Sequence, residues 1–117
     1  MNSVKNDFPE TLKNTLSILN EKKIENLTIL DVREVVSYTD YLIIGTGMNT
    51  PHIQTLADIV AAELKKDFGK SPGVEGYRDA NWILIDGLDY IVHLFLPKAR
   101  EFYALEELWG DAKVISI

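Results

Sequence analysis

The chain contains no cysteine among its 117 residues. Disulfides and thiolate chemistry are therefore excluded. It also has no apolar run near the roughly 20 residues that span a bilayer. The first ten residues, MNSVKNDFPE, lack the apolar core of a secretory signal. We therefore expect a cytoplasmic protein without membrane contact.

Positive charge is also scarce, because 12 Lys and Arg residues face 18 Asp and Glu residues, for a formal net charge of −6. Sequence-independent binding to nucleic acid depends on cations that neutralise phosphates, so this balance argues against it, beyond a possible contact with rRNA. An acidic chain suits a basic protein partner. The alternative is that the charge only keeps the protein soluble.

Glycine and proline are few, at 7 and 4 residues, and 46% of the chain is hydrophobic. This composition is typical of a globular protein, and the length is sufficient for a hydrophobic core. Neither an internal repeat nor a low-complexity tract is visible. The sequence therefore predicts a single domain over residues 1–117.

The apolar spacing predicts an α/β (α+β) fold, with a mixed sheet of about five strands and three helices. The predicted helices cover 7–25, 50–68 and 98–109, and the predicted strands cover 27–32, 40–44, 82–86, 90–96 and, at an edge, 113–117. The near-continuous apolar character of 40–44 is typical of a central strand with both faces covered. Residues 69–79 are predicted to be a linker.

The predicted helix ends follow from capping chemistry. Asp7 is a candidate cap for the first helix, with Glu10 at capping-box spacing. The helix over 50–68 has Thr50 as its predicted cap, Pro51 at its predicted first helical position and Gly69 at its end.

The Gly45-Thr46-Gly47 segment precedes a helix and could bind a phosphate through backbone N–H groups. It lacks the Lys-Ser/Thr of a P-loop and the third glycine of a dinucleotide motif, so a tight strand-to-helix turn is the favoured interpretation. His52 and His93 do not have metal-site spacing, and we expect His93 to be a half-buried strand residue. No two acidic residues are spaced i, i+2 on a strand, so the sequence predicts no metal or catalytic site.

Residues 82–86 and 90–96 predict a hairpin around Gly87-Leu88-Asp89. Alternation and a four-residue connection pair Trp82 with Phe95 and Leu84 with His93 on one face. If helices cover only the other face, these four residues form an open aromatic surface suited to a partner. A covering helix or a second copy of the chain is the alternative, and a one-residue shift in register would reverse the faces.

Taken together and in order, several short motifs resemble those of the ribosomal silencing factor family, also called the Iojap or YbeB family. These motifs are Ser37-Tyr38-Thr39-Asp40-Tyr41, Gly45-Thr46-Gly47, His52, Glu75-Gly76, Trp82-Ile83-Leu84-Ile85-Asp86, Val92-His93-Leu94-Phe95, Ala99-Arg100-Glu101-Phe102-Tyr103 and Leu108-Trp109. The resemblance spans about residues 8 to 112. It implies a nucleotidyltransferase-like fold without enzymatic activity or cofactor.

The resemblance further implies a translational repressor that acts chiefly when nutrients are limiting. Such a protein binds the large ribosomal subunit through ribosomal protein uL-fourteen and sterically blocks the small subunit. The implied partner-binding residues are Trp82, Leu84, Asp86, His93 and Phe95, with Tyr103 and Glu107 on the following helix. A monomer or weak homodimer is expected.

Two other functions stay open. One is a nucleotide-binding or nucleotidyltransferase-like enzyme, with Gly45–Gly47 at the phosphates and Asp40 and Asp86 as metal ligands. The other is an assembly adaptor for the large subunit that uses the same aromatic surface.

Overall fold

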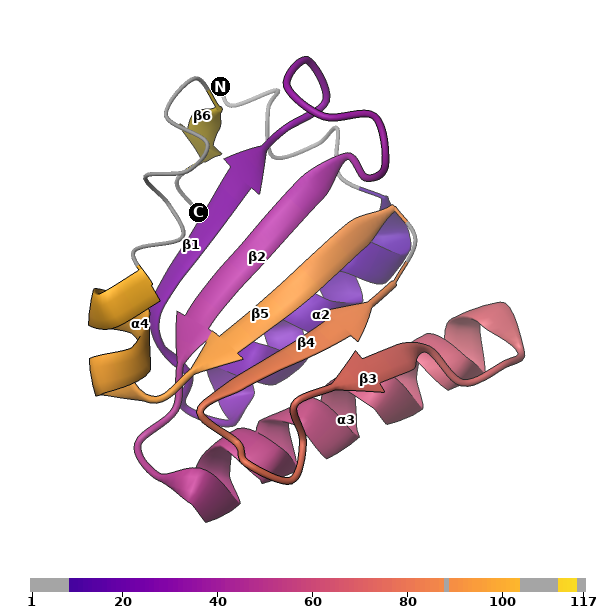
Figure 1. Cartoon of the computed structure of the whole chain (residues 1–117). Coiled ribbons are helices and arrows are strands. Elements are labelled where there is room, and N and C mark those ends of the chain that lie inside the picture. The colour runs from indigo at the N-terminus through magenta and orange to yellow at the C-terminus, as the bar shows by residue number, and fades with distance from the viewer. Residues whose placement is uncertain (1–8, 88, 104–111, 116–117) are drawn as a thin grey trace.

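A computed structural model describes residues 9–87, 89–103 and 112–115 of the protein. Within these residues, six strands form one mixed sheet in the order β3-β4-β5-β2-β1-β6, accompanied by three helices (Figure 1). In chain order the elements are α2 (Glu10–Glu21), β1 (Glu25–Asp31), β2 (Tyr41–Thr46), α3 (Thr50–Phe68), β3 (Gly73–Glu75), β4 (Trp82–Asp86), β5 (Tyr90–Phe95), α4 (Pro97–Tyr103) and β6 (Lys113–Ile115). The predicted α/β architecture is confirmed.

The sheet has one strand more than expected. The additional strand is β3, which lies in the predicted linker and pairs antiparallel with β4. All three of its residues are exposed, so it has no apolar alternation by which the sequence could reveal it. The predicted edge strand at the C-terminal end is confirmed as β6, paired with β1.

The central strand β2 is buried along its whole length, as its apolar sequence predicted. It pairs parallel with β5 and antiparallel with β1. The β1–β2 register shifts between Glu25 and Thr28, and Asn26 within this β-bulge has a positive φ of 50°.

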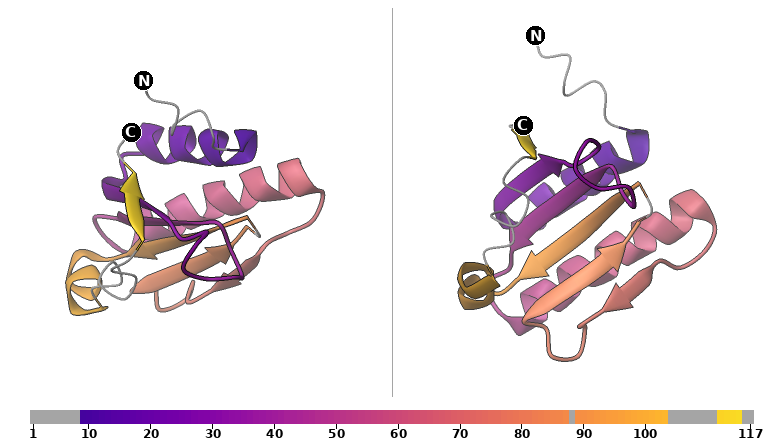
Figure 2. Two further views of the ribbon diagram at one scale, coloured as in Figure 1. Left: turned by 90° about the horizontal axis from the view of Figure 1, so that it is seen from above. Right: turned by 45° about the horizontal axis from the view of Figure 1, so that its top comes forward.

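The two long helices, α2 and α3, cover the same face of the sheet, here called the helix face (Figure 2). Their leucines and isoleucines pack against alternate strand residues, which include Ile83 and Ile85 of β4 and Val92 and Leu94 of β5. These four residues alternate along the hairpin with the residues predicted to share the other face, so the predicted division into two faces is confirmed. A buried hydrogen bond of 2.7 Å between the Tyr90 hydroxyl and Thr15 Oγ1 links β5 to α2.

The opposite face, here called the outer face, carries a second and smaller core. Its buried members are Leu30, Val32, Leu42, Ile44 and Phe95, with Val36, Trp82, Ile91, Ala99 and Ala112 packed against them. Val36 belongs to the segment between β1 and β2, and Ala99 belongs to α4. The outer face is therefore partly covered, although α2 and α3 leave it free.

The helix ends differ from the predictions by a few residues. Asn49, not Thr50, caps α3, because its side chain accepts a hydrogen bond of 2.9 Å from the His52 N–H. The left-handed Gly69 ends α3 as predicted, with φ of 80°. The N-cap position of α2 is Pro9, whose side chain forms no capping bond, and the predicted cap Asp7 lies outside the described residues.

The helix predicted over 98–109 begins one residue earlier, at Pro97, and is described as far as Tyr103. Over the ranges that the structure describes, none of the helices has the length and apolarity required to cross a membrane.

Candidate functional site

The β4–β5 register places the candidate residues as the hairpin pattern predicted. Trp82 lies opposite Phe95 and Leu84 lies opposite His93. Directly paired residues of antiparallel strands project to the same side, so all four lie on the outer face. The possible one-residue shift did not occur.

Aromatic rings from β4, β5 and α4 pack together at this place; Trp82, His93, Phe95 and Tyr103 are here called the aromatic cluster. The Trp82 ring centroid lies 5.1 Å from that of Phe95 and 4.7 Å from that of Tyr103. These separations fall in the favourable range for aromatic pairs. The rings therefore contact one another and form one packed cluster.

Two members of the cluster are buried, which corrects the expectation of an open four-residue surface. Phe95 is 0% exposed and His93 is 5% exposed, while Trp82 and Leu84 are half-buried. The Trp82 ring packs on both residues, and α4 packs on Phe95. Strand alternation cannot predict this tertiary packing. Phe95 and His93 support the surface from below.

His93 also fixes the orientation of Trp82. The Trp82 indole Nε1–H donates a hydrogen bond of 3.0 Å to His93 Nδ1. Because Nδ1 accepts, the imidazole is neutral. Burial lowers the pKa of His93 to about 4, which favours the same neutral form. His93, which the sequence predicted to be half-buried, is therefore buried, and its Nδ1 accepts a hydrogen bond.

The exposed part of the surface lies on α4. Tyr103 is 45% exposed, and Phe102, whose ring centroid is 5.1 Å from that of Tyr103, is 81% exposed. Phe102 was not among the residues predicted to bind a partner. Its position next to Tyr103 in the sequence was the signal that could have identified it. Glu107, the other predicted residue of this helix, lies outside the described residues.

Beside Trp82 the outer face contains a hollow of about 230 Å³, lined by Glu75, Gly76, Trp82 and Leu84. Gly76 has a φ of 80°, and a Cβ there would lie 2.2 Å from the Trp82 carbonyl oxygen. The glycine therefore lets the chain turn tightly before β4. The exposed Glu75 gives this apolar hollow a negative wall.

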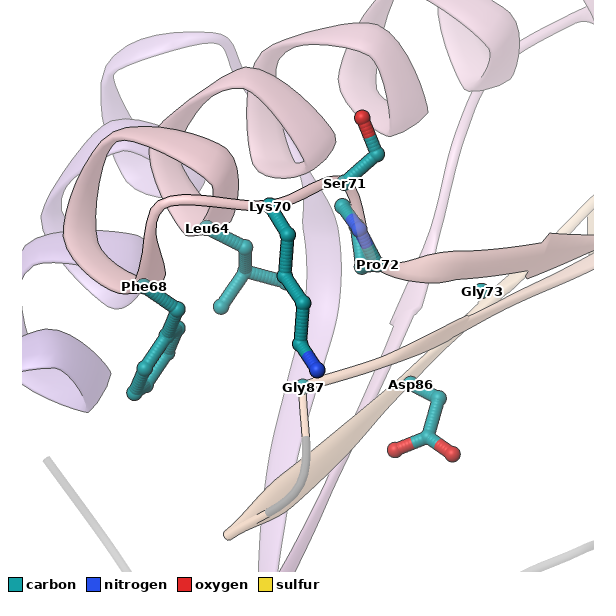
Figure 3. Close-up of a pocket in the computed structure, with 8 residues that line it drawn as sticks. All are labelled: Leu64, Phe68, Lys70, Ser71, Pro72, Gly73, Asp86 and Gly87. Atoms are coloured by element: carbon teal, nitrogen blue, oxygen red, sulfur yellow. The ribbon is translucent and has the colours of Figure 1, made fainter.

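Asp86 lies on the same face at the other end of β4, away from the aromatic cluster. It is exposed and borders a pocket of about 160 Å³ (Figure 3). Leu64 and Phe68 of α3 form one side of this pocket, and the Lys70 side chain extends toward Gly87 (Figure 3). Asp86 thus adds a carboxylate to the edge of the surface but no contact with its rings.

The other histidine has a structural role. His52 Nδ1 accepts a hydrogen bond of 2.9 Å from the Met48 N–H, and its Nε2 lies 2.8 Å from the Lys22 carbonyl oxygen. Since Nδ1 accepts, Nε2–H is the donor to Lys22. His52 therefore connects the loop before α3 to the end of α2.

The residues of the enzyme hypothesis are not brought together. Gly45 and Thr46 belong to the final part of β2, and the Gly47 N–H bonds to the Phe95 carbonyl at 2.9 Å. Asp40 precedes β2, and Asp86 lies at the opposite end of the sheet from Gly47, because β4 runs antiparallel to β5. The glycine turn and the two carboxylates therefore cannot form one site. Among the described residues, no three His, Asp or Glu side chains gather as a metal site would require.

The fold and this surface define a class: a small α/β domain with one helix-covered sheet face and an aromatic cluster beside carboxylates on the other face. The chain matches the family described as "Ribosomal silencing factor during starvation" over residues 5–117. It belongs to the ribosomal silencing factor family, as the motifs predicted.

Individual relatives agree with this assignment. The chain is 31% identical to a ribosomal silencing factor of Chromobacterium violaceum over 92% of this chain and 88% of the relative. It is 30% identical to the mouse protein named mitochondrial assembly of ribosomal large subunit protein 1, over 80% of this chain and 42% of that protein. A crystal structure of a Chromobacterium violaceum protein has a TM-score of 0.81 at 32% identity and covers 86% of this chain and 84% of its own.

Proposed function

We propose that this protein represses translation by binding the large ribosomal subunit at ribosomal protein uL-fourteen and blocking the small subunit sterically. The observation that carries the proposal is the Trp82–Tyr103 surface in a chain of the ribosomal silencing factor family. Steric exclusion requires affinity and no chemistry. A partner-binding surface is therefore sufficient for the function.

The surface has the composition of an interface centre. Trp82, Tyr103 and Phe102 supply large rings, and Trp and Tyr are among the residues on which binding energy concentrates. The rings are held in place by neighbouring rings and by the bond to His93, so little side-chain freedom is lost on binding.

Charge supports a basic partner. Glu75 borders the hollow beside Trp82, Asp86 lies farther along β4, and the whole chain has a net charge of −6. The aliphatic stem of a partner's Lys or Arg would fit against Trp82 and Leu84, with its cationic head near Glu75. Ribosomal proteins are typically basic, so the chemistry matches.

The decisive experiment measures binding of purified protein to isolated large subunits from the same organism. We expect Trp82→Ala to weaken binding by at least about 2 kcal/mol, as at an interface hot spot. Tyr103→Ala, on an exposed position, should weaken binding with little loss of stability. Val114→Ala is the matched control, because Val114 is exposed at the opposite edge of the sheet.

Equal affinity of Trp82→Ala, Tyr103→Ala and wild type, with all three folded by circular dichroism, would overturn the proposed surface. Sucrose-gradient sedimentation tests the partner itself. We expect the protein in cell extract to sediment with free large subunits; confinement to the top of the gradient would contradict the function.

One relative favours a second candidate, an adaptor for large-subunit assembly. The mouse relative is named for assembly of the mitochondrial large subunit. Deletion of the gene would distinguish the two functions: an adaptor predicts accumulation of immature large subunits during growth, whereas a silencing factor predicts excess translation under starvation.

A further inference from the structure

Helix α4 presents the exposed part of the aromatic surface. Ala99 and Tyr103 pack against the outer face, but none of the described residues Pro97–Tyr103 is fully buried. A further interaction fixes the position of this segment on the outer face.

Arg100 provides that interaction. One guanidinium nitrogen, Nη1, donates to the Asn26 carbonyl oxygen and, at 3.0 Å, to Thr46 Oγ1. The other, Nη2, donates to Thr28 Oγ1 at 3.0 Å. A single side chain thus connects α4 to two neighbouring strands, β1 and β2. The fork geometry of a guanidinium suits three acceptors, which a lysine ammonium cannot reproduce.

The acceptors are arranged for this contact. Asn26 lies in the β-bulge of β1 with a φ of 50°. Its carbonyl group therefore does not point along the hydrogen-bonding direction of a regular strand. Bulges reorient backbone and side-chain groups at functional places. Thr28 belongs to β1 and Thr46 to the neighbouring strand β2, and both side chains project from the outer face beneath α4.

We propose that Arg100 is the positioning residue of the partner-binding surface: its bonds to Asn26, Thr28 and Thr46 set α4 so that Tyr103 packs on Trp82 and Phe102 projects into solvent. Tyr103 follows Arg100 by three residues and therefore lies close to the same helix face. Arg100 acts through these rings and does not contact the partner. The inference rests on the proposed function and extends it to a residue at the base of the surface.

The test measures affinity for isolated large subunits and the free energy of unfolding for two independent disruptions. Arg100→Met keeps the stem and removes the guanidinium, whereas the double variant Thr28→Val/Thr46→Val removes two acceptors and leaves α4 unchanged. We expect each to weaken binding about tenfold, the size of loss when an interface anchor is displaced. The variant that combines all three substitutions should lose little more affinity than either alone, because both changes disrupt the same contact between Arg100 and the strands.

Three controls separate positioning from other effects. Lys98→Met removes an exposed positive charge from the same helix and should leave the affinity unchanged. Arg100→Lys should recover only part of the affinity, since it satisfies fewer acceptors. In a Trp109→Phe background, Trp82 is the remaining tryptophan, and its emission should shift in Arg100→Met but not in Lys98→Met.

The outcomes are distinguishable. If Trp82→Ala weakens binding but folded Thr28→Val/Thr46→Val binds as wild type does, the role of Arg100 is refuted and the proposed surface stands. If Trp82→Ala binds as wild type does, the proposed surface itself fails. If Arg100→Met does not fold, the threonine double variant alone decides the question.

Discussion

Gly76 and Gly69 share a φ of 80° in different surroundings. A Cβ at Gly76 would lie 2.2 Å from the Trp82 carbonyl oxygen, whereas no atom outside the neighbouring residues lies within 4 Å of a Cβ at Gly69. Alanine at Gly69 therefore incurs only left-handed strain, about 1 kcal/mol. Gly76→Ala adds a backbone clash at the residue that carries the indole.

We predict that Gly69→Ala lowers the free energy of unfolding by about 1 kcal/mol and Gly76→Ala by at least about twice as much. Chemical denaturation measures both. Gly76→Ala should also weaken large-subunit binding, because it displaces Trp82. Equal destabilisation by the two changes would mean that the turn before β4 relaxes without consequence.

The burial of His93 makes the stability of the protein depend on pH. Burial lowers the pKa of His93 from 6.5 to about 4. Between these values the unfolded chain binds a proton that the folded chain does not, so the free energy of unfolding falls as the pH drops from 6.5 to 4. The contribution is complete above pH 6.5 and amounts to about 3 kcal/mol over the whole window.

Urea denaturation at pH 7 and pH 4.5 should show this loss in the wild type. His93→Asn is the control variant, because its amide oxygen can accept the Trp82 bond near the position of Nδ1 without titrating in this range. The difference between the two proteins should be smaller at pH 4.5 than at pH 7. A constant difference would show that His93 does not titrate in the window.

At the level of elements, the start of α3 decides how the loop after β2 is held. The Asn49 side chain accepts from the His52 N–H, and the His52 ring bonds to the loop at Met48 and to α2 at Lys22. Asn49→Ala should therefore cost about 1 kcal/mol of stability, the usual value for an N-cap. Thr50→Ala should lower the stability clearly less. A larger loss of stability for Thr50→Ala than for Asn49→Ala would mean that Thr50 caps α3, as the sequence predicted.

The hairpin was predictable because β4 and β5 are two apolar runs joined by a short connection that contains Gly87. The register Trp82–Phe95 followed from counting alone, and it is confirmed. The strand β3 was not predictable in the same way, because Gly73, Val74 and Glu75 are three exposed residues without a periodic pattern. Its position depends on pairing with β4, which is a tertiary property.

The covering of the outer face was also beyond local pattern. Phe95 is buried because the Trp82 ring and α4 pack over it. In turn, α4 is held by acceptors more than 50 residues away in the chain. Arg100 carries no signal of this role in the sequence. Strand alternation predicts which face a residue occupies but not what covers that face.

For the whole molecule, the layers separate folding from recognition. Helices α2 and α3 cover the helix face (Figure 1), and the larger core lies between them and the sheet. The exposed rings and Glu75 lie on the outer face. Exposed residues of the outer face can therefore be changed without opening the larger core. This separation allows charge to be tested locally.

The net charge of −6 gives two distinguishable expectations. If the carboxylates guide a basic partner to the surface, Glu75→Gln/Asp86→Asn should slow association with large subunits by up to about tenfold at low salt and reduce its salt dependence. The matched control is Glu10→Gln/Glu21→Gln, which removes two exposed negative charges from α2 on the helix face. Stopped-flow association at several salt concentrations compares the two variants. Equal slowing would show that only net charge acts, whereas a larger effect of Glu75 and Asp86 would locate the attraction at the outer face.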